Sequence, residues 1–279
     1  MVINKRKLIF IDIDGTLLLD DQTVHQSAID AIQEARRKNT LIFIATGRSV
    51  PEITSQFTDI GFDGYICSGG AHINIDGKIF HDTKFEPTNA LKVIEYLIEI
   101  DVDFYLETSS GIFATDTCAQ TAEIMWNKYS EHKDIRIPFP EDLKEIMSSN
   151  SIKDVDASDV RKISFISKEI NFESIYDYLH KDFKIIPNTV FEFGDNSGEI
   201  ASFGNDKSDA VLKVKNFYPF QTFTYAYGNG FNDIDMFNVV DHAVAMGGSP
   251  QEVIKNADEL APSPEEEGIY LSFKRNKII

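Results

Sequence analysis

The chain has 279 residues, enough for one large domain or two moderate ones, and its 42% hydrophobic and 26% charged residues are typical of a globular protein. Its formal net charge of −18 argues against nucleic-acid binding, which depends on Lys and Arg side chains that neutralise phosphates. Its 2 cysteines are too few for a disulfide scaffold or a zinc cluster, and no apolar run is long enough to cross a membrane. We therefore expect a cytoplasmic protein that contacts neither nucleic acid nor a membrane, while its oligomeric state stays open.

Strand and helix patterns alternate through the first third of the chain. The predicted order is strand 8–13, helix 26–38, strand 41–46, helix 51–58 and strand 64–67. Strands separated by helices of this length predict a parallel sheet with right-handed crossovers, that is, an α/β fold. Ligands of such sheets bind at the carboxyl ends of the strands, and this is where Asp12, Asp14 and Thr46 fall.

The middle of the chain has a different pattern. Residues 71–82 predict a hairpin, and from about 84 to 193 helices and strands follow in α+β order, with a last strand near 190–193. Strand–helix alternation resumes from 207 to 257. We therefore predict a discontinuous first domain, residues 1–83 and 194–279, that carries residues 84–193 as an inserted second domain.

Two aspartates follow the first predicted strand at alternate positions. Residues 8–17 read Leu-Ile-Phe-Ile-Asp-Ile-Asp-Gly-Thr-Leu. Because alternate residues of a strand share a face, we expect the carboxylates of Asp12 and Asp14 to lie close together. Such carboxylates repel each other unless a cation lies between them, and carboxylates clustered around a hard divalent cation form phosphate-processing sites. The alternative interpretation is a strand that ends in an acidic turn.

Two further segments offer groups that suit a phosphate. Thr46-Gly47-Arg48 follows the second strand and combines a hydroxyl, an approachable backbone N–H and a guanidinium. Lys207 falls in the first turn of a predicted helix, where the helix dipole disfavours a cation, and this suggests an anion held nearby. Taken alone, a common Thr-Gly turn and a solvated lysine explain these segments at least as well.

A glycine-rich loop between a strand and a helix forms the fourth segment. Residues 227–236 read Tyr-Gly-Asn-Gly-Phe-Asn-Asp-Ile-Asp-Met. Gly228 and Gly230 permit close backbone approach, and Asn229, Asn232 and Asp233 offer oxygens to a hard cation. The alternative interpretation is an Asx-rich helix cap.

Taken together and in this order, the four segments resemble the haloacid dehalogenase (HAD) superfamily, and within it the Cof-type sugar-phosphate phosphatases with a large C2-type cap. The resemblance covers nearly the whole chain, including the position of the cap between the second and third motifs and the closing residues 266–269. It implies a Rossmann-like core with a parallel sheet, an inserted α+β C2-type cap, and a phosphatase that depends on Mg²⁺ and acts on small phosphorylated metabolites.

The resemblance also implies a role for each motif residue. Asp12 would be the nucleophile that becomes an aspartyl phosphate, and Asp14 would protonate the leaving alcohol and then deprotonate the attacking water. Thr46 and Lys207 would hold the phosphoryl oxygens, and Lys207 would also neutralise charge at the nucleophile. Mg²⁺ would be bound by Asp12, the backbone carbonyl of Asp14, Asn229 and Asp233, and we expect substrate contacts from Gly47, Arg48 and Asn232.

The chain departs from the family pattern at three places. Asn229 stands where the family usually has aspartate, and the loss of one negative charge predicts weaker Mg²⁺ binding. Ser208 stands where a glycine usually follows the lysine, with a small expected effect. Gly69-Gly70-Ala71 replaces the usual Asn-Gly-Ala after the third strand, which affects a loop contact only.

Two other functions stay open. A phosphomutase of the same fold would need basic cap residues for a second phosphate, whereas the cap is acidic and its second half offers the basic pair Arg161-Lys162. A non-catalytic binding protein, impaired at Asn229, is the other alternative. The intact motif aspartates, Thr46 and Lys207 argue against it.

Overall fold

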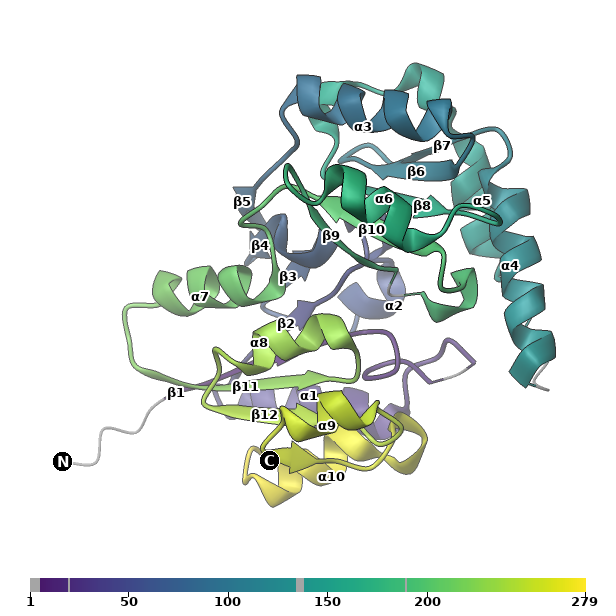
Figure 1. Cartoon of the computed structure of the whole chain (residues 1–279). Coiled ribbons are helices and arrows are strands. Elements are labelled where there is room, and N and C mark those ends of the chain that lie inside the picture. The colour runs from purple at the N-terminus through teal and green to yellow at the C-terminus, as the bar shows by residue number, and fades with distance from the viewer. Residues whose placement is uncertain (1–5, 20, 134–137, 189) are drawn as a thin grey trace. The chain divides into compact units, whose positions relative to one another are not determined.

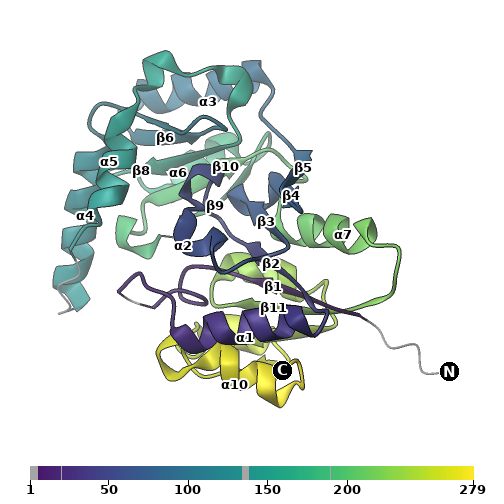
Figure 2. The same cartoon turned by 180° about the vertical axis from the view of Figure 1, so that it is seen from behind.

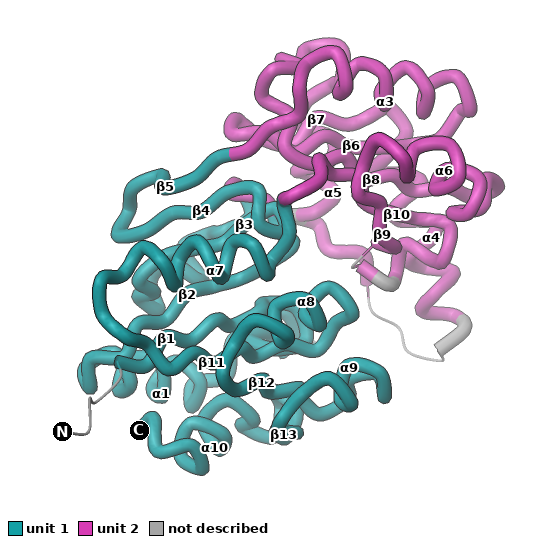
Figure 3. The backbone as a smooth tube through the Cα atoms, turned by 60° about the vertical axis from the view of Figure 1, so that its left-hand side comes forward, with its two compact units in different colours: residues 1–48, 52–82, 205–279 teal, residues 49–51, 83–204 magenta. Residues whose placement is uncertain are grey.

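The structure is a computed structural model that describes residues 6–19, 21–133, 138–188 and 190–279. The chain forms two compact units, coloured separately in Figure 3: residues 1–48, 52–82 and 205–279 make up the first, and residues 49–51 and 83–204 the second. Figures 1 and 2 follow the elements of both units from opposite sides. None of the helices in the described ranges is long and apolar enough to cross a membrane.

The first unit is built on an eight-stranded sheet in the order β13-β12-β11-β1-β2-β3-β4-β5. The strands from β13 to β3 pair in parallel, and β4 and β5 continue the sheet as an antiparallel hairpin. This confirms the predicted α/β fold with a parallel sheet. The strands are β1 (Arg6–Ile11), β2 (Leu41–Ala45), β3 (Gly64–Cys67), β4 (His72–Ile75), β5 (Lys78–Asp82), β11 (Thr222–Gly228), β12 (His242–Ala245) and β13 (Glu259–Leu260).

Helices cover both faces of this sheet because its central strands are apolar on both faces. In β1, Ile9 and Ile11 pack into a cluster with residues of α1 and α10, whereas Leu8 and Phe10 pack into a second cluster with residues of α7 and α8. Figure 2 shows α1 and α10 side by side on one face. The helices of this unit are α1 (Gln26–Arg37), α2 (Ser55–Thr58), α7 (Lys207–Phe217), α8 (Ile234–Phe237), α9 (Gln251–Lys255) and α10 (Gly268–Arg275).

The second unit contains an antiparallel five-stranded sheet in the order β7-β6-β8-β10-β9. Helices α3 and α6 pack against Phe104 and Phe165 in one core cluster, and α4 and α5 pack against Tyr105 and Ile166 in another. The elements are β6 (Asp103–Glu107), β7 (Ile112–Ala114), β8 (Lys162–Ile166), β9 (Lys184–Pro187), β10 (Ser197–Ala201), α3 (Pro87–Glu99), α4 (Cys118–Lys133), α5 (Glu141–Ser149) and α6 (Phe172–Leu179).

The end of the second unit differs from the sequence-based prediction. Residues 194–204 were expected in the first domain, but β10 lies between β8 and β9 and pairs antiparallel with both, so they belong to the second unit. A strand was also predicted near 190–193, where the structure has a short 3-10 helix, Phe191–Phe193. The Ser-Gly-Glu-Ile-Ala stretch of β10 has low β-propensity, and its two strand partners hold it extended.

Candidate active site

Three strands of the first unit end beside one another at the carboxyl edge of the sheet. Asp12 follows β1, and its N–H donates to the carbonyl of Tyr227 at 2.9 Å. Thr46 follows β2, and its N–H donates to the carbonyl of Ile66 at 2.9 Å. Asn229 follows β11, the parallel neighbour of β1 on its other side. The sheet therefore brings the residues that follow these three strands to one edge, where ligands of α/β sheets bind.

Lys207, the first residue of α7, connects the third and fourth motifs to the first. Its Nζ donates to Oδ1 of Asp12 and to Oδ1 of Asp233, each at 2.6 Å. All three side chains are buried, with exposed fractions of 2%, 7% and 0% for Lys207, Asp12 and Asp233. Two protein carboxylates therefore lie beside this lysine, where the sequence predicts an anion.

The charges of this buried triad do not balance, because two carboxylates face one ammonium. Burial of the carboxylate, followed by the charge of Asp233, raises the pKa of Asp12 to about 7, although Lys207 acts in the opposite direction. Burial opposes the charge of Lys207, but its two carboxylates raise the pKa of the ammonium above its ordinary value. A divalent cation beside Asp12 would offset the remaining negative charge and lower the pKa of this carboxyl.

Asp233 also fixes the loop that carries Asn229. Its Oδ2 accepts hydrogen bonds from the N–H groups of Asn229 and Gly230, both at 2.9 Å. The carboxylate lies over Gly228, where a Cβ atom would be 2.5 Å from its Cγ. Both Asp233 oxygens are thus engaged, one by Lys207 and one by the loop.

Asn229 faces the turn that follows Asp14. Its Oδ1 accepts a hydrogen bond from Oγ1 of Thr16 at 3.4 Å. Gly15 has φ +72°, and a Cβ at this position would lie 2.1 Å from Nδ2 of Asn229. The turn therefore needs glycine both for its left-handed backbone and for this close approach.

Asp14 has a different partner from Asp12. Nη2 of Arg48 lies 2.6 Å from Oδ1 of Asp14, and Nε lies 3.0 Å from Oδ2, which is a bidentate pair. The Asp14 side chain is 54% exposed and that of Arg48 is 23% exposed. The cation that the sequence predicts between the two aspartates stays a prediction. In the structure, Asp14 pairs with Arg48, while Asp12 shares Lys207 with Asp233.

The remaining predicted site residues lie at the same edge. Thr46 is fully buried, and its Oγ1 accepts a hydrogen bond from the N–H of Arg48 at 3.1 Å, with Gly47 between them. Asn232 is half-buried, and its Oδ1 lies 2.6 Å from the position of a Cβ on Gly230. Sequence reasoning missed Gln22 and Phe57, which contact Arg48 and which no motif marks.

The oxygen donors at this edge fit Mg²⁺. The carboxylate of Asp12, the backbone carbonyl of Asp14 and the amide oxygen of Asn229 are the hard ligands that this cation prefers. Across the described part of the chain, no three His, Cys, Asp or Glu side chains group as a metal site. A cation here would therefore rely on a mixed set of side-chain and backbone oxygens.

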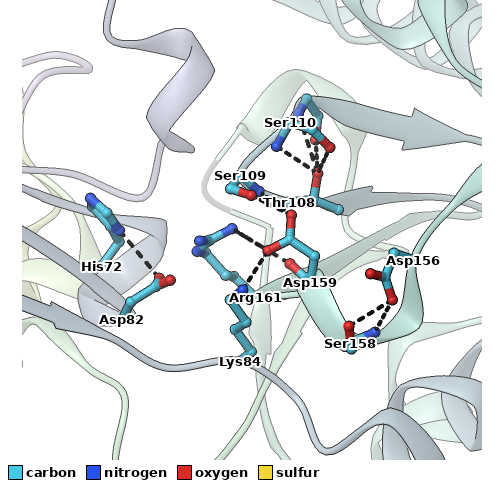
Figure 4. Close-up of polar contacts among 11 residues, drawn as sticks. His72, Asp82, Lys84, Thr108, Ser109, Ser110, Asp156, Ser158, Asp159 and Arg161 are labelled. Carbon is cyan, nitrogen blue, oxygen red and sulfur yellow. Dashed lines mark hydrogen bonds and ion pairs between the residues drawn. The ribbon is translucent and has the colours of Figure 1, made fainter. Parts of the chain in front are cut away.

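The second unit holds a polar cluster around Asp159, drawn in Figure 4. Asp159 accepts a hydrogen bond from the N–H of Ser109 at 2.9 Å and forms ion pairs with Lys84 at 2.7 Å and Arg161 at 3.4 Å. Burial opposes the charge of Asp159, but these donors lower its pKa below the ordinary value. Figure 4 also draws His72 of the first unit, whose Nδ1 lies 3.2 Å from Oδ1 of Asp82.

Lys162, the other member of the predicted basic pair, is buried between two carboxylates of the second unit. Its Nζ lies 2.8 Å from Oε1 of Glu107 and 3.1 Å from Oε2 of Glu199. Burial opposes the ammonium charge, but the two glutamates raise the pKa of Lys162 well above its ordinary value. Both members of the basic pair therefore engage carboxylates of their own unit.

The sequence and the fold are similar to those of known phosphatases. A putative phosphatase, YkrA of Bacillus subtilis, is 26% identical over 272 residues, which is 96% of each chain. The B. subtilis 5-amino-6-(5-phospho-D-ribitylamino)uracil phosphatase YwtE is 21% identical and covers 94% of this chain and 95% of its own. A solved HAD subclass IIB sugar phosphatase superimposes with a TM-score of 0.74 at 22% identity, over 98% of this chain and 100% of its own.

The family itself is recognised directly from the sequence. The profile of the haloacid dehalogenase-like hydrolases matches residues 9–272, which include both strand-end aspartates, Lys207 and the Asn229 loop. This match confirms the resemblance drawn from the four motifs. The chain belongs to the haloacid dehalogenase-like hydrolase family.

Proposed function

We propose that this chain is a Mg²⁺-dependent phosphatase that hydrolyses small phosphorylated metabolites, sugar phosphates or similar compounds, through an aspartyl phosphate. One observation carries the proposal: buried Asp12 is joined through Lys207 to Asp233, at the sheet edge that also holds Asp14 and Thr46. Family membership and the names of the similar phosphatases support the reaction class. The sugar phosphatase and the ribitylaminouracil phosphatase among them support a small phosphorylated substrate.

In the first step, Asp12 attacks the phosphorus atom in line with the leaving oxygen. Lys207 holds Oδ1 of Asp12, and we assign Oδ2 as the attacking oxygen. The O–P bond to Asp12 forms while the P–O bond to the alcohol breaks, and the leaving oxygen takes a proton from Asp14. A buried nucleophile next to a more exposed acid matches a substrate that approaches from the solvent side of Asp14.

In the second step, water hydrolyses the aspartyl phosphate. Asp14, now a carboxylate, removes a proton from the attacking water, the new P–O bond forms and the bond to Asp12 breaks. Asp12 is regenerated and inorganic phosphate leaves. The covalent intermediate divides one difficult hydrolysis into two easier steps.

The phosphoryl oxygens are held by donors from three motifs. Lys207 supplies a buried ammonium, Thr46 a hydroxyl, and Gly47 a backbone N–H after β2. We keep Asn232 as a substrate-side contact, while Arg48 is engaged with Asp14. Positioned donors of this kind stabilise the charge that spreads over the equatorial oxygens of the transferring group.

Mg²⁺ would be held by Asp12, the carbonyl of Asp14 and Asn229. Asp233, expected from the sequence as a further ligand, instead has one oxygen on Lys207 and the other on the Asn229 loop, so we give it a supporting role. When bound there, Mg²⁺ supplies positive charge that favours ionised Asp12 and stabilises the phosphoryl group. Asn229 contributes a neutral amide oxygen, so the site carries one charge fewer than with aspartate. We propose a cytoplasmic location for this enzyme.

The test is phosphate release from p-nitrophenyl phosphate and a panel of sugar phosphates, with and without Mg²⁺. We expect turnover by the wild type with Mg²⁺, loss of turnover with chelator, and loss of at least about 10³-fold in Asp12→Asn. Asp30→Asn makes the same chemical change at an exposed position on α1 and should retain full activity. Trapping of ³²P on the wild type, and not on Asp12→Asn, identifies the acylphosphate.

Each alternative function predicts a distinct result. No turnover on any substrate, with no trapped phosphate, would reject the phosphatase and favour a binding protein impaired at Asn229. Phosphate exchange between two positions of a sugar phosphate, in place of phosphate release, would identify a phosphomutase. The paired state of Arg161 and Lys162 does not favour this second activity, because both cations already engage carboxylates.

A further inference from the structure

Arg48 holds both oxygens of Asp14, and its own position is fixed from several sides. The N–H of Arg48 donates to Oγ1 of Thr46 at 3.1 Å, and its carbonyl accepts from the N–H of Ser68 at 2.7 Å. The guanidinium lies over the ring of Phe57, with 5.5 Å between Cζ and the ring centroid. The backbone of Arg48 and its guanidinium are therefore both held by contacts other than the pair with Asp14.

Gln22 adds a contact from a different loop. Its Oε1 accepts from Nη2 of Arg48 at 3.4 Å, and its own carbonyl accepts from Nε2 of Gln56 at 2.7 Å. Gln22 has a left-handed backbone, with φ +65°. The loop that carries Gln22 is thus tied to α2 and to Arg48 together.

The bidentate geometry of the Arg48–Asp14 pair is important because Asp14 is exposed. A carboxylate that is 54% accessible has rotamer freedom, and a proton-transfer group must be held in one orientation to act efficiently. A planar guanidinium with two parallel N–H donors fixes a carboxylate plane, which a lysine ammonium does not. Arg48 therefore constrains the orientation of Asp14 in addition to balancing its charge.

We propose that Arg48, supported by Gln22 and Phe57, is a positioning residue for the proton transfer by Asp14 and acts on the reaction through this carboxylate. The inference rests on the proposed phosphatase reaction and deepens it. It changes the assignment of Arg48 from a direct substrate contact, as expected from the sequence, to a residue that orients the acid and base of the reaction. The bidentate pair fixes the plane of the Asp14 carboxylate, which is the form that takes the proton from water. When one Asp14 oxygen carries the proton for the leaving oxygen, the N–H bond to the other oxygen keeps the carboxyl in place.

The test compares kcat/KM of Arg48→Lys for two aryl phosphates that differ in the acidity of the leaving group, phenyl phosphate and p-nitrophenyl phosphate. The phenolate leaving group depends strongly on a proton, whereas p-nitrophenolate depends on it little. If Arg48 orients Asp14, we expect a loss of about 100-fold for phenyl phosphate and about 10-fold for p-nitrophenyl phosphate, within the range of general acid catalysis. Gln22→Asn, which keeps a residue that tolerates a left-handed backbone, should show the same bias with a smaller loss.

Two further measurements separate positioning from direct binding. In an Asp14→Asn background, Arg48→Lys should have little further effect, because two residues that act through one group are non-additive. Arg36→Lys is the matched control: Arg36 makes a similar bidentate pair with Asp63, at 2.9 and 3.2 Å, away from the site. It should leave kcat/KM unchanged for both substrates.

Equal losses on the two substrates, or additive losses in the Asp14→Asn background, would overturn the positioning role and return Arg48 to substrate binding. Failure of the wild type itself to release phosphate from either substrate would instead reject the proposed function. The variants therefore test the positioning role, and the wild type in the same experiment tests the proposed function.

Discussion

Nζ of Lys207 lies 2.6 Å from Oδ1 of Asp12, although 195 residues separate them in the sequence. The pair ties the start of α7 to the end of β1, and the insertion of the whole second unit lies between these points in the chain. The charge of buried Asp12 is therefore compensated only when the segment that follows the second unit packs against β1. Substitution of Lys207 tests this contact directly.

Lys207→Met should both inactivate the enzyme and destabilise the first unit. Removal of the ammonium leaves Asp12 and Asp233 buried side by side without their shared cation. We expect activity to fall by at least about 10²-fold and the free energy of unfolding to fall by about 3–5 kcal/mol, as is common for a broken buried ion pair. Urea unfolding at neutral pH without metal measures the second effect.

Lys215→Met is the control for this substitution. Lys215 lies in the same helix, is 32% exposed and is 4.0 Å from Asp241, so its loss should change stability by less than about 0.5 kcal/mol. Adding Asp233→Asn to Lys207→Met should restore part of the stability and none of the activity. An unchanged free energy of unfolding in Lys207→Met would contradict the buried triad.

The buried position of Asp12 predicts an unusual pH dependence of the metal-free protein. Its folded pKa, about 7, lies above the ordinary value, so the folded chain binds a proton that the unfolded chain has already released. The contribution of this proton to the free energy of unfolding is fully present below the unfolded pKa, about 4. It is lost as the pH rises through the folded pKa, about 7. The free energy of unfolding of the wild type should therefore fall between pH 5 and pH 8. The Asp12→Asn variant should not show this part of the fall.

Mg²⁺ should reverse this trend, because it binds the ionised form of Asp12. The affinity for Mg²⁺ is expected to rise with pH up to about 7, and binding below this pH should release a proton. Isothermal titration calorimetry in two buffers of different ionisation enthalpy counts that proton. Mg²⁺ binding at pH 6 without proton release would show that Asp12 is already ionised in the metal-free protein.

The sequence predicted where the site lies better than it predicted the contacts within it. Asp12, Asp14 and Thr46 were placed at one edge because strand–helix alternation is a local pattern, and the ends of adjacent parallel strands must coincide. The pairings of Asp14 with Arg48 and of Lys207 with Asp233 were not predicted, because a side chain chooses its partner only after elements distant in sequence have packed.

The end of the second unit, residues 190–201, also shows that tertiary contacts decide what local sequence does not. Ser-Gly-Glu-Ile-Ala at 197–201 carries no strand signal of its own, yet it becomes an inner strand with neighbours on both sides. Residues near 190–193, which do carry an apolar strand pattern, form a 3-10 helix instead. Sheet pairing therefore decided both assignments against local propensity.

Asn229→Asp should strengthen Mg²⁺ binding. The substitution places a carboxylate, and with it a full negative charge, among the oxygens assigned to the metal. We expect a lower Mg²⁺ concentration for half-maximal activity, by about 10-fold, and a lower stability without metal because like charges are brought together. Titration of p-nitrophenyl phosphate turnover with Mg²⁺ measures the first effect.

Asn238→Asp controls for the change in net charge, because Asn238 is exposed at the end of α8. Its Mg²⁺ dependence should match that of the wild type. Equal Mg²⁺ requirements in Asn229→Asp and the wild type would mean that the amide at 229 does not weaken the site, and the departure from the family pattern would have no consequence for the metal.

Gly15→Ala should impair the metal site through Asn229. The new Cβ would lie 2.1 Å from Nδ2 and 2.9 Å from Cγ of Asn229, so the amide must rotate away from its place beside the Asp14 turn. Gly77→Ala is a close control, since Gly77 has φ +76° against +72° at Gly15 but nothing within 4 Å of its Cβ position. Both variants should lose about 1–2 kcal/mol of stability from the left-handed backbone, and only Gly15→Ala should need several-fold more Mg²⁺. A matching Mg²⁺ requirement in the two variants would show that the orientation of Asn229 does not matter for the metal.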